Sequence, residues 1–428
     1  MVRKARAHFF WLLAALLAAC GGGSDSSAPA AVEPPPPAAD DAALAADAAA
    51  AAPSETAAKR AARVHREALV LDAHCDTLMR VVDDGHDLGA TNAEGHVDFP
   101  RMKAGGVDAQ VFAVWVDPRS FEGRLWERAL SMIDALHREV AEHADQAGLA
   151  TTAAEARALA AEGKRAAFLG VEGGYVLEGE IERLAELEKR GVSTLTLTWW
   201  GPTSFADGSG GEPRWHGLND QGRDIVREMN RLGIVVDVSH ASAETFDDVL
   251  AVTTQPVIAS HSCTAALADH HRNLTDEQLC ALAKNGGVVG IDFVAGFLDE
   301  ANHAAADALR EKMKPELDAE EKKYAHDPPL ARKKRWALYK ERARAELPPV
   351  PLERVIEHID HAVQVAGVDH VGLGSDFDGF SVGPAGLDDC TALPRITEAL
   401  LARGYSEDDV AKILGGNFLR VFEQVLGG

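Results

Sequence analysis

From about residue 54 onward, the chain alternates between short apolar runs and longer amphipathic segments. The runs are rich in Val, Ile, Leu and Thr and are apolar on successive positions, a pattern typical of strands buried on both faces of a parallel sheet. The predicted strands cover residues 69–74, 109–116, 167–172, 194–199, 234–240, 256–261, 287–293 and 370–376.

Amphipathic segments such as 180–190, 220–232 and 275–284 separate most of these runs and are predicted helices. Eight strand–helix units in succession predict an α/β fold, a (β/α)₈ barrel of the TIM type. A doubly wound open sheet is the structural alternative. The highly charged stretch 299–346 interrupts the repeat, so we expect long helices inserted after the seventh strand, as a solvated lid or buttress.

Composition bears on the size of the core and on the class of partner. With 46% hydrophobic and 26% charged residues, the chain has enough apolar material for a large core. Acidic residues outnumber basic ones by 67 to 43, which gives a formal charge of -24. Nucleic acid is therefore not an expected partner, because its binding requires a concentrated basic surface.

The N-terminus has the pattern of an export signal. Arg3, Lys4 and Arg6 precede the apolar run 9–17, which is too short to span a membrane comfortably. The sequence from Leu17 to Cys20 resembles a bacterial lipobox, in which the Cys becomes lipid-modified. An ordinary signal peptide with an incidental Cys is the alternative.

These features predict three parts of the chain. Residues 1–19 are a signal peptide, and 20–53, rich in Gly, Ser, Pro and Ala, are a flexible lipid-anchored tether. Residues 54–428 are the barrel domain. We expect an exported protein held on a bacterial membrane by a lipid on Cys20, facing the periplasm or the cell exterior.

Residues able to bind a metal stand at the ends of five predicted strands, counting those directly after a strand. They are His74 and Asp76 (first strand), Glu172 (third), His240 (fifth), His261 (sixth) and Asp376 (eighth). In a barrel the C-terminal ends of the strands meet on one face, where active sites are built.

Such a set suits hydrolytic zinc chemistry. Neutral imidazole and carboxylate oxygen are zinc ligands, and a carboxylate can lie between two ions that activate water. A single His at a strand end is more often a hydrogen-bonded core residue, but the joint occurrence predicts a metal centre. No CxxC pair is present, so a thiolate site is not expected. Other histidines in helical or charged stretches are expected at the surface, namely His65, His137, His143, His303 and His358.

The chain after about Val64 resembles the membrane (renal) dipeptidase family. The resemblance is carried by these motifs in this order: Asp72-Ala-His-Cys-Asp76, Gly170-Val-Glu-Gly-Gly174, Leu195-Thr-Leu-Thr198, Asp237-Val-Ser-His240, Ser260-His-Ser262, His271-Arg-Asn273 and Gly372-Leu-Gly-Ser-Asp-Phe-Asp-Gly379.

The resemblance implies two zinc ions per chain. His74 and Asp76 would hold one ion, His240 and His261 the other, and Glu172 would bridge them. It also implies that a hydroxide between the ions attacks the peptide bond.

The resemblance further implies the residues that handle substrate. Asp376 would act as the catalytic acid and base, and Arg272 would pair with the free carboxylate of the substrate. Asn273, next to Arg272 in the same motif, is also predicted to bind substrate. One departure from the family concerns Trp199, because mammalian members carry a His at this position. Trp199 is predicted to line the substrate pocket, with core packing as the alternative.

The resulting prediction is a zinc dipeptidase on a barrel of the metal-dependent hydrolase kind, and whether its substrates include dipeptides with a C-terminal D-residue is left open. One alternative is another binuclear amidohydrolase acting on N-acyl amino acids, lactones or related amides. A second is a non-catalytic, lipid-tethered binding protein. The sequence leaves open the side-chain preference and a homodimer, which relatives often form.

Overall fold

The computed structural model describes residues 55–427. The predicted signal peptide 1–19, the tether 20–53 and Cys20 lie outside the described residues, so they remain predictions. Among residues 55–427, no helix combines the length and the apolar character needed to cross a membrane.

Within the described range, the core is one parallel sheet of nine strands. The strands are β1 (Leu71–Cys75), β2 (Ala109–Trp115), β3 (Ala147–Leu149), β4 (Arg165–Glu172), β5 (Val192–Thr196), β6 (Val235–Asp237), β7 (Ile258–Ser262), β8 (Val288–Ile291) and β9 (Val371–Leu373). They are arranged in the order β2-β1-β9-β8-β7-β6-β5-β4-β3, and a further pairing of β2 with β4 closes the sheet into a barrel.

The closing pair is continuous, from Ala109 opposite Ala166 to Trp115 opposite Glu172. β3 pairs only with the first residues of β4, and it therefore lies outside the barrel of eight strands. The predicted (β/α)₈ barrel is confirmed. The sequence did not predict β3, which is three residues long and only partly buried.

Helices surround the barrel strands, which are buried along their full length. They are α1 (Ala57–Glu67), α2 (Thr77–Asp84), α3 (Phe99–Ala104), α4 (Leu125–Glu142), α5 (Ala153–Ala161), α6 (Arg183–Lys189), α7 (Asp220–Leu232), α8 (Ala243–Val252), α9 (Asp276–Asn285), α10 (Ala295–Leu298), α11 (Glu300–Lys323), α12 (Pro328–Glu346), α13 (Leu352–Ala366), α14 (Pro394–Ala402), α15 (Glu407–Ala411) and α16 (Asn417–Val425).

Local signals explain the helix boundaries. The side chain of Asn219 accepts a hydrogen bond from the backbone N–H of Gly222 at the start of α7 (3.0 Å), and Gly233, at φ 75°, ends the helix. Thr275 and Gln278 form a capping box at the start of α9.

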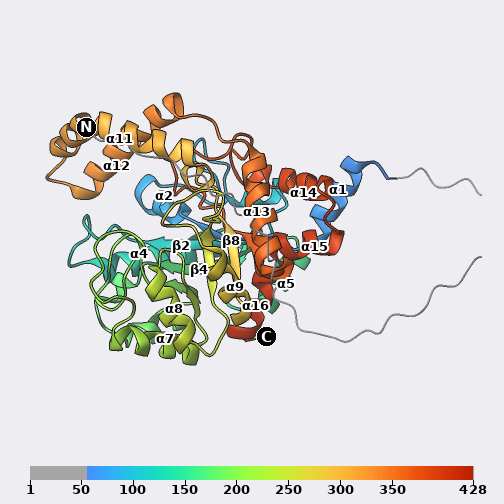
Figure 1. Ribbon diagram of the computed structural model, residues 1–428, viewed down its shortest axis with the longest axis horizontal. Helices are drawn as coiled ribbons and strands as arrows, with labels where there is room; N and C mark the ends of the chain where they lie inside the picture. Colours follow the sequence, from blue (N-terminus) through green and yellow to red (C-terminus); the bar gives the residue numbers. More distant parts are fainter. Residues whose placement is uncertain (1–54, 428) are drawn as a thin grey trace, which may run out of the picture. The chain divides into compact units, whose positions relative to one another are not determined.

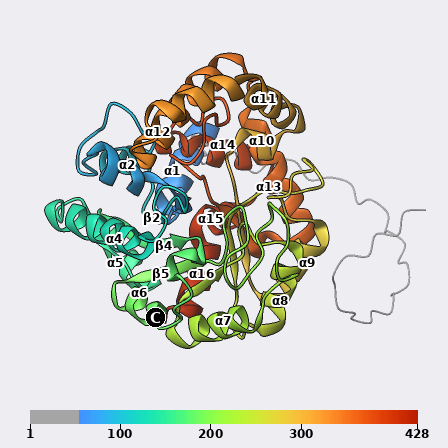
Figure 2. The ribbon, with the colours of Figure 1, turned by 90° about the vertical axis from the view of Figure 1, so that its left-hand side faces the viewer.

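The charged stretch after the seventh barrel strand forms the long helices α11 and α12, as predicted. We call residues 300–346 the hairpin. Its two helices enclose a small core of their own, which contains Leu309, Met313, Leu317, Tyr339 and Ala343. Figures 1 and 2 show the hairpin on one side of the strands, with α7 and α8 on the other.

Candidate metal centre and active site

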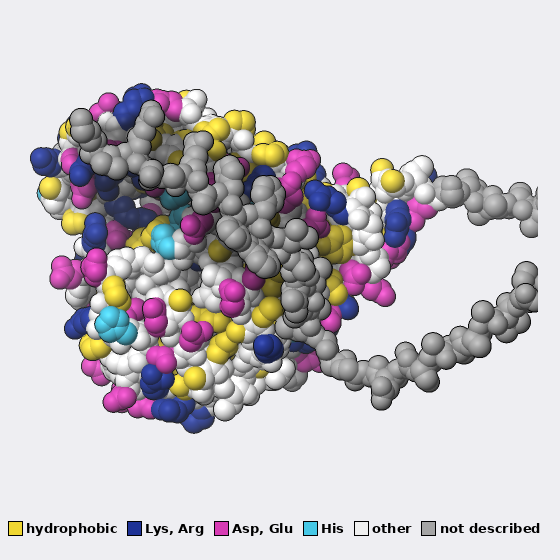
Figure 3. Space-filling model, in the orientation of Figure 1, with side chains coloured by type: hydrophobic (Ala, Val, Ile, Leu, Met, Phe, Trp, Pro, Cys, Tyr) yellow, Lys and Arg dark blue, Asp and Glu magenta, His cyan; other side chains and the backbone are white. Residues whose placement is uncertain are grey.

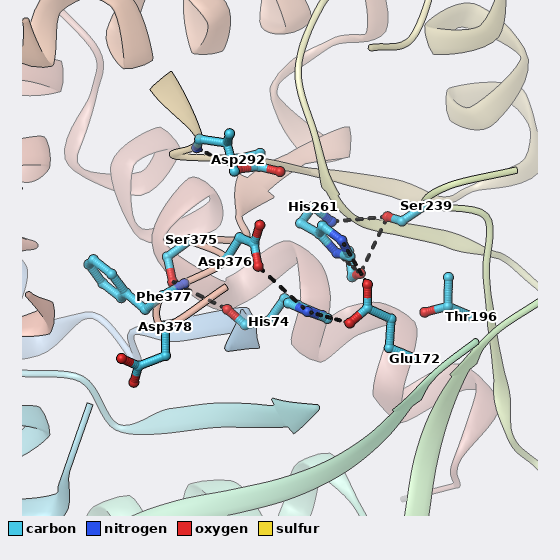
Figure 4. A network of polar contacts seen from close by, with 12 residues as sticks. His74, Glu172, Thr196, Ser239, His261, Asp292, Ser375, Asp376, Phe377 and Asp378 are labelled. Atoms are coloured by element: carbon cyan, nitrogen blue, oxygen red, sulfur yellow. Dashed lines mark hydrogen bonds and ion pairs between the residues drawn. The ribbon is translucent and has the colours of Figure 1, made fainter. Parts of the chain in front are cut away.

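Three imidazoles converge on Glu172 at the C-terminal end of the barrel (Figure 4). The Nε2 atoms of His74, His240 and His261 lie 3.4, 2.9 and 3.7 Å from its carboxylate oxygens. The Nε2 atoms of His240 and His261 are 3.0 Å apart. Residues from β1, β4 and β7, and from the loop after β6, therefore meet at one point.

A second group of ligand atoms adjoins the first. Atoms of His74, Asp76 and Asp376 all lie within 4.8 Å of one another. Gly379 makes this approach possible, because a Cβ at that position would clash with the carboxylates of both Asp76 and Asp376. His74 belongs to both groups, so the two form one continuous cluster.

Burial and mutual charge interactions shift the pKa values of the residues in this cluster. Burial disfavours a charged His74, but Glu172, Asp76 and Asp376 outweigh it and raise its pKa to about 10. Burial, with Glu172 nearby, raises the pKa of Asp76 to about 7. For Asp376, burial and the carboxylates of Asp292 and Asp76 raise the pKa well above its usual value.

The other ligands shift in the opposite sense. Burial lowers the pKa of His240 to about 4 and that of His261 well below its ordinary value, which favours the neutral imidazole that binds metal. Burial alone would raise the pKa of Glu172, but the histidines around it lower it, so this carboxyl stays ionised.

The donor set fits a metal. Among the described residues, four buried atoms of the cluster have no hydrogen-bond partner: His74 Nε2, Asp76 Oδ1, Glu172 Oε2 and His240 Nδ1. Buried polar atoms are normally paired, so unpaired ones that face one another indicate a cation site. Imidazole nitrogens together with carboxylate oxygens are the ligands typical of zinc.

Hydrogen bonds orient the ligands. Ser260 Oγ donates to Asp237 Oδ2 (2.6 Å) and lies 2.8 Å from His261 Nδ1. Since the one hydroxyl proton of Ser260 is used on Asp237, His261 donates from Nδ1 and keeps a lone pair on Nε2. Thr196 Oγ1 also donates to Asp237 Oδ2 (2.6 Å), which ties β5 to β6.

A similar link joins the strand of His74 to the strand before Asp376. Asp72 and His74 are two residues apart on β1, so they share one face. The Asp72 carboxylate accepts hydrogen bonds from the backbone N–H (2.8 Å) and the hydroxyl (2.5 Å) of Ser375.

The backbone is strained where it presents these groups. His240, Asp376 and Asp378 have φ of 65°, 58° and 71°. Such values are uncommon for residues other than glycine and concentrate at functional sites. Asp378 points away from the cluster (Figure 4) and accepts hydrogen bonds from Thr77 Oγ1 (2.7 Å) and Arg80 Nε (2.6 Å). It therefore anchors the loop that carries Asp376.

The cluster opens into a cavity of about 430 Å³. Asp76, Glu172, His240 and Asp376 line it, together with Arg272 and Trp199. Arg272 is buried, its Nη2 donates to the carbonyl of His261 (2.8 Å), and its Nε has no partner among the described residues.

Trp199 is half-buried and lies beside Trp115 and His240, with ring centroids 4.9 and 6.3 Å away. It is both a wall of the cavity and a packing residue. Asn273 does not line this cavity. Its side-chain nitrogen donates to the carbonyls of Ala268 and Phe297, both at 2.8 Å.

The structure thus brings the five predicted metal ligands and Asp376 into one cluster at the floor of the cavity. Arg272 and Trp199 line the same cavity, and Asn273 lies outside it. His65 and His358 were expected at the surface, and this was wrong because both are buried. His303 was also expected at the surface, and it lines the cavity. The helical setting of these histidines indicated exposure, but tertiary packing decided otherwise.

Asp292 was not predicted to belong to the site. It is fully buried at the end of β8, and its Oδ2 has no partner among the described residues. Burial raises its pKa to about 7, although Arg272 opposes the shift. The signal was present in the sequence, because an Asp within a buried apolar run is costly and needs a compensating role.

Buried imidazoles and carboxylates at the mouth of a parallel barrel, with an arginine in the same cavity, define a metal-dependent hydrolase. A family model described as membrane dipeptidase (peptidase family M19) matches residues 58–426. The chain belongs to this family and is a metallodipeptidase.

Individual relatives agree with this assignment. Dipeptidase tcpJ of Claviceps purpurea (strain 20.1) is 32% identical over 340 residues, which cover 77% of this chain and 69% of that protein. The probable dipeptidase PvdM of Pseudomonas aeruginosa superimposes with a TM-score of 0.75 at 26% identity, over 86% of this chain and 98% of that one. A metallopeptidase of Rhodobacter sphaeroides, solved with a phosphinate mimic of the dipeptide L-Ala-D-Ala, gives a TM-score of 0.67 at 29% identity and covers 84% and 99% of the two chains.

Proposed function

We propose that the protein hydrolyses the peptide bond of dipeptides, including those with a C-terminal D-residue, with two zinc ions at the barrel mouth. The observation that carries this proposal is the shared cavity of the histidine–carboxylate cluster and Arg272. The dipeptide mimic bound to the Rhodobacter sphaeroides relative supports the substrate class and the D-residue.

In this proposal His74 and Asp76 hold one ion, His240 and His261 hold the other, and Glu172 lies between them. Its two carboxylate oxygens support that role, because Oε2 faces His74 and Oε1 faces His240 and His261. When bound, the ions would supply a Lewis acid and a water of lowered pKa.

Arg272 selects the substrate by its free carboxylate. Its guanidinium is buried and lines the cavity, and burial lowers its pKa. A planar fork of donors suits a carboxylate, which would also compensate the buried charge. Because the carboxylate must lie one residue from the scissile bond, longer peptides are poor substrates.

Asp376 moves the proton. Its Oδ1 lies 3.9 Å from His74 Nε2, on the cavity side of the cluster. A carboxyl of raised pKa can take a proton from the attacking water and deliver it to the leaving amine nitrogen.

Hydrolysis of a small panel tests the proposal: L–L and L–D dipeptides, an N-acyl amino acid and a lactone. The purified protein is assayed as isolated, after chelation and after zinc is restored. We expect dipeptide cleavage that is lost on chelation and regained with zinc. Cleavage of the lactone or the N-acyl amino acid alone would assign the site to another amidohydrolase reaction.

The proposal extends to location and assembly. The lipobox-like sequence ending at Cys20 supports an exported bacterial lipoprotein held by a lipid at the membrane. Cys20→Ser is expected to move the protein from the membrane fraction to the soluble fraction. A homodimer rests on the family resemblance alone, and light scattering on the purified protein tests it.

A further inference from the structure

The hairpin, which the sequence indicated only as a lid or buttress, supplies one wall of the catalytic cavity. Its cavity-lining residues include His303, Ala306, Asp307, Arg310, Trp336 and Tyr339. Figure 3 shows Lys, Arg and His side chains around a hollow between the hairpin and the rest of the barrel.

One face of α11 follows the cavity. His303, Ala306, Asp307 and Arg310 are three or four residues apart, so they lie along one side of the helix. His303 is at the end of this row that lies nearest to Arg272. Its ring centroid lies 4.5 Å from that of His270, two residues before Arg272.

The inner end of the wall is next to the proposed carboxylate site. The guanidinium of Arg272 lies 5.4 Å from the ring centroid of Phe297, and the same ring is 4.4 Å from that of His270. From there the row on α11 leads away to Arg310, whose guanidinium is 5.2 Å from the ring centroid of Tyr339. A substrate whose carboxylate sits at Arg272 would therefore direct its C-terminal side chain along the hairpin.

Part of the surface that this side chain would meet is apolar, beside the charged residues of α11. Phe297, Trp336, Leu347 and Val382 line the cavity here, and the Trp336 and Tyr339 ring centroids are 6.0 Å apart. Tyr339 is 4% exposed, and its hydroxyl is buried without a hydrogen-bond partner among the described residues. Ligand pockets typically combine apolar walls with a few placed polar groups.

We propose that the hairpin forms the subsite for the side chain of the C-terminal residue and selects large apolar or aromatic side chains there. The inference rests on the proposed function for the position of the substrate carboxylate. Burial of a large side chain against Trp336 and Tyr339 removes apolar surface from water, whereas a C-terminal Gly leaves that wall wet.

Binding and turnover test the subsite separately. Phosphinate analogues of Ala–Gly and Ala–Phe are titrated calorimetrically into the zinc-loaded protein, and kcat/KM is measured for the two dipeptides. We expect the Phe forms to be favoured at least about tenfold by both measures, as befits discrimination by a hydrophobic pocket. Trp336→Ala should remove most of this preference and leave the Gly forms nearly unchanged.

Leu338→Ala is the matched control. Leu338 packs on the core of the hairpin in the same helix but does not line the cavity. It should keep the preference for Phe even if the hairpin is destabilised. Equal binding of both analogues by the unaltered protein, or the same loss in Leu338→Ala as in Trp336→Ala, would overturn the subsite.

The two proposals fail in different ways. Selective binding of the Phe analogue without cleavage of any dipeptide would refute the proposed function and support the subsite. Cleavage of both dipeptides with no preference would support the function and refute the subsite.

Discussion

The barrel mouth and the hairpin line the same cavity, but they are built in opposite ways. At the mouth, His240 and Glu172 are 5% and 3% exposed and lie on or next to strands of a closed sheet. On the hairpin, the side chains of Arg310 and Lys312 are 53% and 63% exposed and take part in surface ion pairs. Surface pairs contribute little to stability, so the hairpin depends on its small core.

The difference suggests that the mouth and the hairpin have separate roles, metal binding and side-chain selection. Metal chemistry requires ligands held rigidly, and strand ends tied together by Asp72 and Asp237 provide this. Selection of a side chain requires only a shaped wall, and an inserted hairpin can supply one without disturbing the barrel. Changes at the mouth should therefore affect every substrate, and changes on the hairpin only some.

The largest effect is expected at Glu172. Glu172→Gln removes the negative charge shared by three imidazoles, so zinc binding and hydrolysis of all dipeptides should fall by more than the roughly 10–100-fold typical of residues that only orient ligands. Zinc content and kcat/KM measure this. Glu178→Gln, in the loop that follows, is the control. If the Glu172→Gln protein kept its zinc and its activity, Glu172 would not be needed to hold the metal.

Asp376→Asn should separate chemistry from metal binding. The loss of a proton-transferring carboxyl is expected to lower kcat by about 10²–10⁴-fold while zinc content is kept. Asp388→Asn, an exposed acid in the loop after β9, should have no such effect. If both variants turned over at the normal rate, another group would have to carry the proton.

The free energy of unfolding should depend on pH through His358, which lies at the base of the hairpin. Thr264 N–H donates to His358 Nδ1 (3.1 Å), and His358 Nε2 lies 3.1 Å from the carbonyl of Leu298, just before the hairpin. Burial lowers the pKa of His358 to about 4, although the Leu298 carbonyl opposes the shift. The unfolded chain therefore binds a proton at higher pH than the folded protein does.

The stability that neutral His358 provides is complete above about pH 6.5 and is lost as the pH falls toward 4, by an amount on the order of 3 kcal/mol. Urea unfolding between pH 7 and 4 should show a smaller loss in His358→Gln. His137→Gln, at a partly buried His that contacts the carbonyl of Arg190, serves as the control. Identical pH profiles for His358→Gln and the unaltered protein would contradict this role.

Asp237→Asn should produce the smallest effect at the mouth. Asp237 Oδ2 accepts hydrogen bonds from both Ser260 Oγ and Thr196 Oγ1. Its Oδ1 accepts from the backbone N–H groups of Ser239 and Ser260. Whichever oxygen became the amide nitrogen, two accepted hydrogen bonds would be lost. Zinc affinity is expected to fall about 10–100-fold, as for other groups that orient metal ligands. The exposed Asp224→Asn should bind zinc normally. Unchanged affinity in Asp237→Asn would show that the Ser260 link does not orient His261.

The same comparison explains what could be predicted from the sequence. Strand ends in a barrel must converge, so His74, Glu172, His240, His261 and Asp376 could be assigned to one mouth from their positions alone. The hairpin could be predicted as helices, but not as a wall of the cavity. Which face of an inserted helix meets the barrel depends on long-range packing, so His303 and Tyr339 carried no local signal. Strand β3 escaped prediction for a related reason, since a three-residue edge strand has no periodicity to detect.

Activity as a function of zinc added to the chelated protein tests the central claim most directly. The account predicts that dipeptide hydrolysis is absent without metal and rises to a plateau at two zinc ions per chain. Hydrolysis that persists in the metal-free protein, or a plateau at one ion per chain, would contradict a centre in which Glu172 lies between two metals.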